Sequence, residues 1–180
     1  PDMGTLLQAG TVLLGEQFQV YTKAPLILRQ QLIFPYVHGF AFVKAALLQG
    51  GWAGMARLYQ RLPLSTEQIL HPEKYFITFE VPGQVLFHIA PEHLSGQWTR
   101  RKQDILGEFL LTVVLQQFLP EAEARQSAAG WHGDRYELWK QATSGRMLLA
   151  CVTVWDTDND AIEFWQSYAR LLSRKYPDWP

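Results

Sequence analysis

The order of apolar and polar residues predicts a mainly helical first half. Between residues 5 and 70, apolar side chains recur at the three- to four-residue spacing of a helix. One such stretch spans residues 6–14. A second carries one apolar face, made by Tyr36, Phe40, Val43 and Leu47. Pro35 suits the first turn of this second helix and Gly50-Gly51 suits its end. Since nearly every side of it is apolar, we expect a central helix that is buried all round.

Shorter elements are predicted up to residue 81. Residues 52–59 indicate another helix. Ser65, followed by Glu67 and Gln68, is typical of a helix cap. Apolar and polar residues alternate over residues 76–81, which predicts a strand with one buried face that ends at Pro82-Gly83.

The middle of the chain predicts two further helices. Residues 105–118 are strongly apolar, and Asp104 stands where a capping residue is expected. Residues 121–129 form a shorter polar stretch after a proline, and Gly130 follows as a stop. We therefore expect a buried helix followed by a surface helix.

The last third predicts a β-hairpin and a final helix. Residues 135–141 and 146–155 flank a Thr-Ser-Gly turn. Residues 147–152 are apolar on both faces, so we expect this second strand to be central. Apolar residues between 161 and 172 fall at helical spacing, which predicts a helix packed on the sheet. The fold class is therefore α+β: a mainly helical N-terminal half, a small antiparallel sheet and a packed C-terminal helix.

Composition indicates one soluble domain spanning residues 1–180. A chain of this length, with 48% hydrophobic residues and one cysteine, needs neither disulfide nor metal to fold. The net charge of −1 and one basic cluster at residues 100–102 do not suit a nucleic-acid partner. His38 and Lys44 interrupt the longest apolar run, so we expect no membrane span. The chain starts at Pro1 without a leader, which suggests a processed or trimmed polypeptide.

No chemical motif is complete in the sequence. The five histidines, His38, His71, His88, His93 and His132, include no His-Glu-x-x-His pair. His88 and His93 share neither a helical nor a strand face, so a surface loop is the expected setting. Cys151 lies in an apolar strand where a thiol is inert. Serine-nucleophile and phosphate-binding loops are absent. We predict no metal ligand.

Several segments nevertheless resemble one protein family in the same order along residues 25–170. They are Phe34-Pro35-Tyr36, Gly50-Gly51-Trp52, the run Ser-Thr-Glu-Gln-Ile-Leu-His-Pro-Glu-Lys-Tyr at 65–75, Gly107-Glu108, Gly130-Trp131, Gly133-Asp134-Arg135-Tyr136 and Trp155-Asp156-Thr157. The run at 65–75 is the most specific of them. Together they resemble a bacterial metallopeptidase-like, gluzincin-like family whose members are often exported or lipid-anchored.

The resemblance implies a function and an alternative. Fuller members carry His-Glu-x-x-His and a further glutamate on upstream helices, and this chain has neither, since Glu16 does not match the ligand motif. We therefore expect a catalytically incomplete metallopeptidase-like domain, not an enzyme by itself, that binds a polypeptide or an assembly partner. The alternative is the substrate-cleft half of a zinc metallopeptidase whose metal-binding segment lies outside this chain. Only then would zinc be a cofactor.

The same resemblance implies that certain polar residues would face the position of the family's substrate cleft. Glu67, His71 and Tyr75 are the weak catalytic candidates, because a histidine or tyrosine there would stabilise an oxyanion. Asp134, Arg135 and Trp131 are the binding candidates. A structural role is the competing interpretation. Glu67 would cap its turn, His71 would bond a backbone carbonyl, and Asp134 would pair with Arg135 or a loop amide. A small-ligand module is a third class and requires a deep apolar pocket.

Overall fold

The computed structural model describes residues 20–90, 94 and 96–178. The chain divides into two compact units, residues 1–63 and 64–180, and each is described by itself. The expectation of a single domain stays a prediction. The helix expected within residues 6–14 lies outside the described residues, as does His93.

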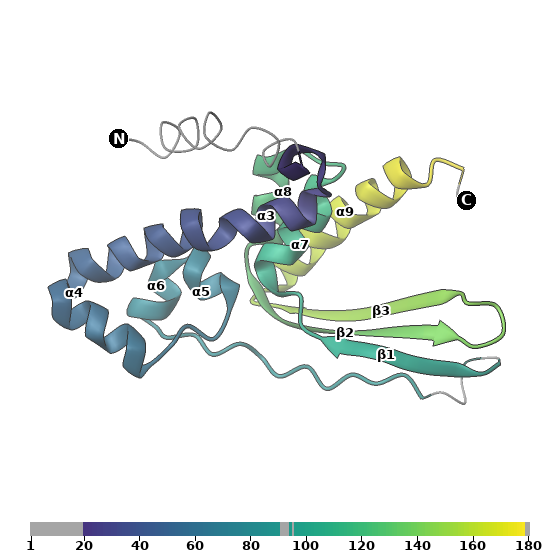
Figure 1. The fold of residues 1–180 in the computed structure, drawn as a ribbon, viewed down its shortest axis with the longest axis horizontal. Helices are drawn as coiled ribbons and strands as arrows, with labels where there is room; N and C mark the ends of the chain where they lie inside the picture. Colours follow the sequence, from purple (N-terminus) through teal and green to yellow (C-terminus); the bar gives the residue numbers. More distant parts are fainter. Residues whose placement is uncertain (1–19, 91–93, 95, 179–180) are drawn as a thin grey trace. The chain divides into compact units, whose positions relative to one another are not determined.

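The first unit is helical from Leu26 to Gln60, apart from a kink at two glycines. Helix α3, Leu26–Phe34, continues through the π-helical turn η1, Pro35–Gly39, into α4, Phe40–Gln60 (Figure 1). Gly50 and Gly51 leave the helical conformation inside α4, with φ of −144° and 54°. This kink lets the backbone of Gly54 press on the carbonyl of Ala46, where an added Cβ would lie 2.5 Å from the oxygen. The helix end at the glycine pair and the short helix after it are thus confirmed.

The expectation that this helix is buried all round is wrong for the described residues. Phe42 and Ala46 are buried, but Tyr36, Phe40 and Leu48 are 69%, 59% and 77% exposed. By length and composition alone, Leu26–Gln60 is a candidate membrane span. The expectation of no membrane span therefore stays a prediction.

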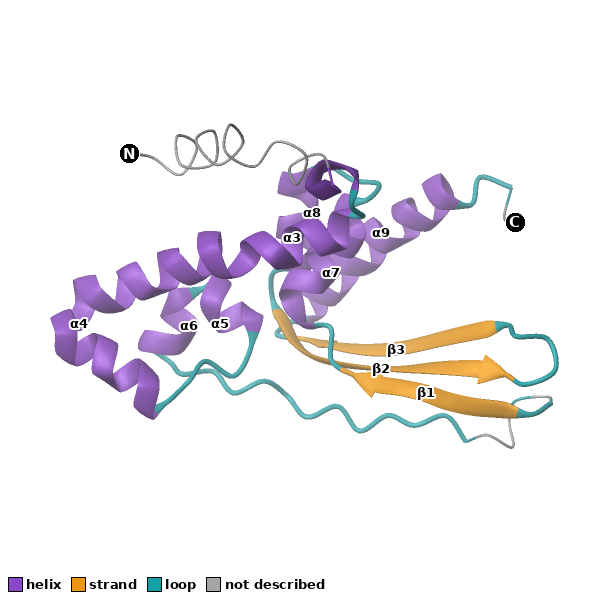
Figure 2. Ribbon diagram, in the orientation of Figure 1, coloured by secondary structure: helices purple, strands orange, loops and turns teal. Residues whose placement is uncertain are grey.

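The second unit combines a three-stranded antiparallel sheet with helices (Figure 2). The helices are α5 (Thr66–Leu70), α6 (Pro72–Phe76), α7 (Gly107–Gln116), α8 (Glu121–Ala128) and α9 (Asp158–Lys175). The strands are β1 (Trp98–Asp104), β2 (Trp131–Gln141) and β3 (Met147–Trp155), in the order β1-β2-β3. The α+β class, the hairpin and the C-terminal helix are confirmed.

The strand predicted at residues 76–81 is wrong. Phe76 ends α6, and the chain then folds back, because the Glu80 amide donates to the Lys74 carbonyl at 2.7 Å. The side-chain amide of Gln68 also donates to the Glu80 carbonyl at 2.7 Å. These bonds satisfy backbone groups that a sheet neighbour would otherwise pair, so the alternating pattern does not produce a strand.

The prediction that β3 is central is also wrong. The central strand is β2, which pairs with β1 on one side and β3 on the other. The apolar residues of β3 are partly solvent-exposed instead, with Met147 at 53% and Leu149 at 60%. Strand β1 escapes sequence detection because its residues, WTRRKQD, are nearly all polar. Asp104 ends that strand and binds the Ile105 amide, and the capping residue of α7 makes no side-chain bond.

The core lies between helices α7, α8 and α9 and the start of β2. Leu115 and Leu119 pack with Ala124 of α8 and Leu171 of α9. Helix α9 begins with a capping box between Thr157 and Asp160. Its Phe164 ring lies 4.6 Å from the Trp155 ring, centroid to centroid, at the end of β3. The predicted packing of this helix on the sheet is confirmed.

Candidate functional site

The short helices α5 and α6 bring three polar side chains together. The Ser65 hydroxyl accepts the Gln68 amide at 3.2 Å, which confirms the predicted cap. Helix α5 lasts little more than one turn, and Pro72 starts α6 directly after His71. Glu67, His71 and Lys74 are thus placed by two consecutive helical turns.

Lys74 is surrounded by carboxylates from three parts of the second unit. Its Nζ lies 2.7 Å from Glu67 Oε1, 3.1 Å from Glu80 Oε2 and 2.5 Å from Asp156 Oδ2. Glu67 belongs to α5, Glu80 to the loop after α6, and Asp156 to the junction between β3 and α9. Lys74 therefore ties these three parts together as a shared counter-ion.

Burial and ion pairing act against each other in this cluster, with different outcomes for Glu67 and Lys74. Glu67 is 2% exposed, and its removal from water raises its pKa above the ordinary value although Lys74 acts against that shift. Burial likewise works to lower the pKa of Lys74, but its bonds to Asp156, Glu67 and Glu80 overcome this and raise the pKa. The raised pKa of Lys74 keeps its ammonium group protonated beside the three carboxyl groups.

The same three carboxylates are close enough together to be considered as metal ligands. Within residues 20–90, 94 and 96–178, Glu67, Glu80 and Asp156 form the group whose ligand atoms lie close enough, within 4.8 Å, to hold an ion. An all-carboxylate set suits calcium or magnesium better than a hydrolytic zinc ion, which takes histidine or cysteine ligands in most sites. The ammonium group of Lys74 already lies between these oxygens. Lys74 thus does the electrostatic work of a bound cation.

His71 forms a pair with a buried glutamate of α7. Its Nε2 lies 2.8 Å from Oε1 of Glu108, whose residue is 3% exposed. The hydrogen bond to Glu108 raises the pKa of His71 even though burial opposes the shift. Oε2 of Glu108 is buried without a hydrogen-bond partner among the described residues. A half-exposed imidazole oriented by a buried carboxylate is the arrangement that general acid–base chemistry uses.

The three catalytic candidates predicted around this turn differ in what they contact. Tyr75 is 4% exposed and makes edge contacts with the rings of Phe76 and Phe79. Glu67 binds Lys74 and does not cap its turn, since Ser65 does that. His71 bonds a carboxylate, not the backbone carbonyl that the structural interpretation expected. The structure brings Glu67 and His71 to one region and places the Tyr75 side chain in the interior.

Asp134 and Trp131 hold the first turn of α7. Asp134 Oδ1 accepts the Gly107 amide at 2.7 Å and the Trp131 indole N–H at 2.9 Å, and Oδ2 accepts the Leu106 amide at 2.8 Å. Asp134 and Trp131 are each 2% exposed. A carboxylate at a helix N-terminus also complements the helix dipole. These two predicted binding residues therefore position Glu108, the next residue of α7, and have little surface to offer a ligand.

Sequence reasoning missed Glu137, the most completely bonded carboxylate described. It is fully buried on β2 and accepts bonds from His88 at 2.9 Å, the Ile89 amide at 3.0 Å, Arg100 at 2.7 Å and Trp139 at 3.0 Å. These donors outweigh burial and lower the pKa of Glu137 to about 2. The sequence signal for its burial was its position two residues from Trp139, on the same face of the predicted strand.

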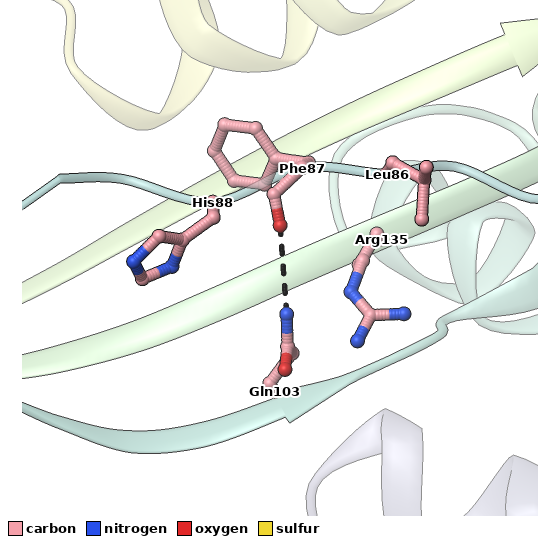
Figure 3. A pocket seen from close by; sticks show the side chains of 5 residues that line it. All are labelled: Leu86, Phe87, His88, Gln103 and Arg135. Atoms are coloured by element: carbon pink, nitrogen blue, oxygen red, sulfur yellow. Dashed lines mark hydrogen bonds between the residues drawn. The ribbon is translucent and has the colours of Figure 1, made fainter.

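Arg135 is the predicted binding residue that reaches a cavity. It lines a pocket of about 340 Å³ with Gln103 of β1 and with residues 86–88 of the extended segment before β1 (Figure 3). Glu137 holds that segment on the sheet through His88 and Ile89. The buried carboxylate of Glu137 thus fixes the segment that forms one wall of the pocket, and β1 and β2 form the other.

Comparison with known proteins covers the sheet and the last three helices. Residues 93–178 match a domain of unknown function, DUF8575, which is a little under half of the chain. The match includes Glu108, Asp134, Arg135 and Glu137 and leaves out α5 and α6 with His71. Neither a curated protein nor a solved structure matches the chain.

Proposed function

We propose that this chain is a catalytically incomplete, metallopeptidase-like domain that binds an extended polypeptide along the outer edge of β3. The observation that carries the proposal is the contrast between the two edge strands of the sheet. In the described part of the chain, β1 and β3 each pair with β2 alone. Each therefore presents a row of backbone groups on its other side.

Strand β1 carries the usual protection of an exposed edge. It contains the basic residues Arg100, Arg101 and Lys102, and its register with β2 shifts between Arg100 and Lys102. Charged side chains and irregular pairing both discourage the addition of another strand. The β1 edge is therefore a poor template for a partner.

Strand β3 has none of these protections. Its nine residues, MLLACVTVW, include no charged residue, proline or glycine, and they pair with β2 without a register shift from Gly133↔Val154 to Lys140↔Met147. Leu149 is 60% exposed and Val154 41% exposed. A long, regular and apolar edge is a hazard unless a partner covers it. A function in strand binding explains why this edge is kept.

Strand addition would use the backbone for affinity and the side chains for selectivity. The added main chain would bond to the outward N–H and C=O groups of β3, independently of its sequence. Met147 and Leu149 lie on one face of the strand and Val152 and Val154 on the other. Apolar side chains of the partner would meet them on both faces, so the expected ligand is an extended chain rich in apolar residues.

The site at α5 and α6 supports a binding role over catalysis by this chain alone. The sequence lacks His-Glu-x-x-His, and Lys74 fills the carboxylate cluster. No serine or cysteine hydrogen-bonds His71 within the described residues. A peptidase needs either an activated water or a nucleophile next to its base.

The proposal is tested by fluorescence anisotropy with fluorescein-labelled β-casein, an extended polypeptide. Leu149→Glu should weaken binding at least ten-fold, because a charge on the edge repels an incoming apolar strand. Ile162→Glu is the matched control, since Ile162 is 52% exposed on α9 and the substitution adds the same charge. The control should bind within two-fold of the natural chain.

Hydrogen exchange gives a second measurement for the same complex. Bound casein should slow exchange of the outward amides of β3. No binding by the natural chain, equal loss in both variants, or protection confined to β1 would each overturn the proposal.

The second candidate is the substrate-cleft half of a zinc peptidase, and the orientation of His71 by Glu108 favours it. It is tested on the natural polypeptide that includes any sequence upstream of Pro1. Zinc content near one ion per chain, peptide hydrolysis, and a His71→Ala variant with lower kcat and retained zinc would support it. A longer polypeptide without zinc would overturn it.

A further inference from the structure

The pocket around Arg135 combines apolar walls with a cationic group. Figure 3 shows Arg135 rising from β2 between Leu86 and Gln103, with Phe87 and His88 farther along the extended segment. Its volume of about 340 Å³ suits one side chain or a chain end. Leu86 is 93% exposed, so the pocket carries an apolar surface that solvent reaches.

The charge of Arg135 has no counter-ion in the part of the chain that the structure describes. Glu137, two residues along the same face of β2, is taken by His88 and Arg100. Asp134, the sequence neighbour, is buried and bonded to two backbone amides and to Trp131. Neither carboxylate contacts the Arg135 guanidinium. The acidic residues on either side of Arg135 along β2 are thus bonded to other donors, and the pocket keeps a positive charge.

The geometry of the Arg135 guanidinium group indicates which kind of ligand would bind. A guanidinium group presents two parallel N–H donors that match a carboxylate. A single cation suits a singly charged group better than a phosphate, which binds best to several donors. The Gln103 amide adds a donor at the limit of hydrogen bonding, since it lies 3.5 Å from the Phe87 carbonyl and 3.3 Å from Glu137 Oε1. The apolar surface of Leu86 favours an apolar group next to the carboxylate.

We propose that this pocket binds a carboxylate of the partner polypeptide, with Arg135 as its ion-pair partner. This inference rests on the proposed function, because it assumes that a polypeptide is bound. The carboxylate belongs either to the C-terminus or to an acidic side chain, and both share the same chemistry. Arg135 would add selectivity to a complex whose affinity comes mainly from the β3 edge.

Three fluorescein-labelled peptides of one apolar sequence distinguish the sources. The first ends in a free carboxylate, the second in an amide, and the third in an amide with one internal glutamate. The chain should bind at least one acidic peptide about ten-fold more tightly than the neutral peptide, which corresponds to about 1.4 kcal/mol. Preference for the first peptide identifies the C-terminus, and preference for the third identifies a side chain.

Two arginine variants test the assignment. Arg135→Met should abolish the preference for a carboxylate and leave binding of the neutral peptide within two-fold. Arg101→Met, on the exposed neighbouring strand β1, removes the same charge and should keep the preference. A preference that survives Arg135→Met, or one lost equally in Arg101→Met, would overturn the inference.

The two proposals fail in different ways. If all three peptides bind equally and Leu149→Glu weakens all of them, the polypeptide-binding function stands and the Arg135 pocket is excluded as a subsite. If no peptide binds, the proposed function itself is contradicted. If the acidic peptide binds the Leu149→Glu variant as tightly as the natural chain, binding at the β3 edge is contradicted.

Discussion

Nε2 of His71 lies 2.8 Å from Oε1 of Glu108, and this contact joins residues 37 positions apart in the sequence. Glu108 is buried at the start of α7, where Asp134 fixes the preceding amides. The orientation of one half-exposed imidazole thus depends on a chain of buried contacts from β2 through α7 to the α5–α6 turn. Glu108 is the residue to change if His71 has a chemical role.

Glu108→Gln should lower the pKa of His71, because the hydrogen bond to Glu108 is the main cause that raises it. The protonated imidazole stabilises the fold below its unfolded pKa near 6.5, and this stabilisation is lost as the pH rises through the higher folded pKa. The variant should flatten that decline. An NMR titration of the His71 ring measures the shift directly. Glu73→Gln is the control, since Glu73 lies 3.7 Å from the other ring nitrogen and should matter less.

Asp134→Ala should lower the free energy of unfolding by about 3 kcal/mol, because it leaves buried N–H donors of α7 and Trp131 without an acceptor. Urea unfolding measures the change. Asp104→Ala removes the residue that the sequence favours as the cap. Asp104 accepts the Ile105 amide and pairs with Lys102, both in exposed positions, so this control should cost about 1 kcal/mol or less. Equal losses in the two variants would contradict the assignment.

Lys74→Met should destabilise the second unit by about 3 kcal/mol at neutral pH, because it leaves the buried carboxylate of Glu67 without its counter-ion. Burial then raises the pKa of Glu67 unopposed. A raised carboxyl pKa makes stability fall as the pH rises, so acidification toward that pKa should recover part of the loss. Urea unfolding at several pH values tests this. Lys102→Met breaks an exposed pair with Asp104 and should leave the stability of the unit unchanged within experimental error.

Gly107→Ala should cost about 1 kcal/mol more than Gly145→Ala. Both glycines have positive φ, 74° and 70°, so both substitutions carry the backbone strain of a left-handed residue. An added Cβ at Gly107 would also lie 2.9 Å from the Thr66 hydroxyl, whereas nothing lies within 4 Å at Gly145. Thermal or urea unfolding of the two variants separates strain from overlap. Equal costs would show that Thr66 moves freely.

Local signals predicted much of the fold. The Ser65 cap, the glycine pair that ends the first part of α4, and the β2–β3 hairpin each depend on residues that are neighbours in sequence. Apolar residues also identified α7 and α9, and the proline before α8 and the glycine after it identified that helix. These elements are set by backbone preferences within a few residues, so sequence reasoning finds them.

Long-range contacts account for what sequence reasoning missed. The polar strand β1 has no apolar alternation and exists because β2 offers it a partner. Strand position depends on neighbours as well, and β3 is at the edge despite its apolar residues. The ion clusters around Lys74 and Glu137 join residues up to 82 positions apart. No local sequence pattern predicts such pairs, whereas Arg135, a binding candidate chosen from the sequence, does line a cavity.

The unlike borders of the sheet also limit how large any assembly built on it can become. Growth is favourable on the side of Met147–Trp155 and opposed by the cations of Trp98–Asp104. If two copies paired through β3, the dimer would be closed and only its two β1 strands would remain at the outer edges. Further copies could not add to it, so no fibre would form. Because only one edge of the sheet accepts another strand, self-association through β3 stops at two copies.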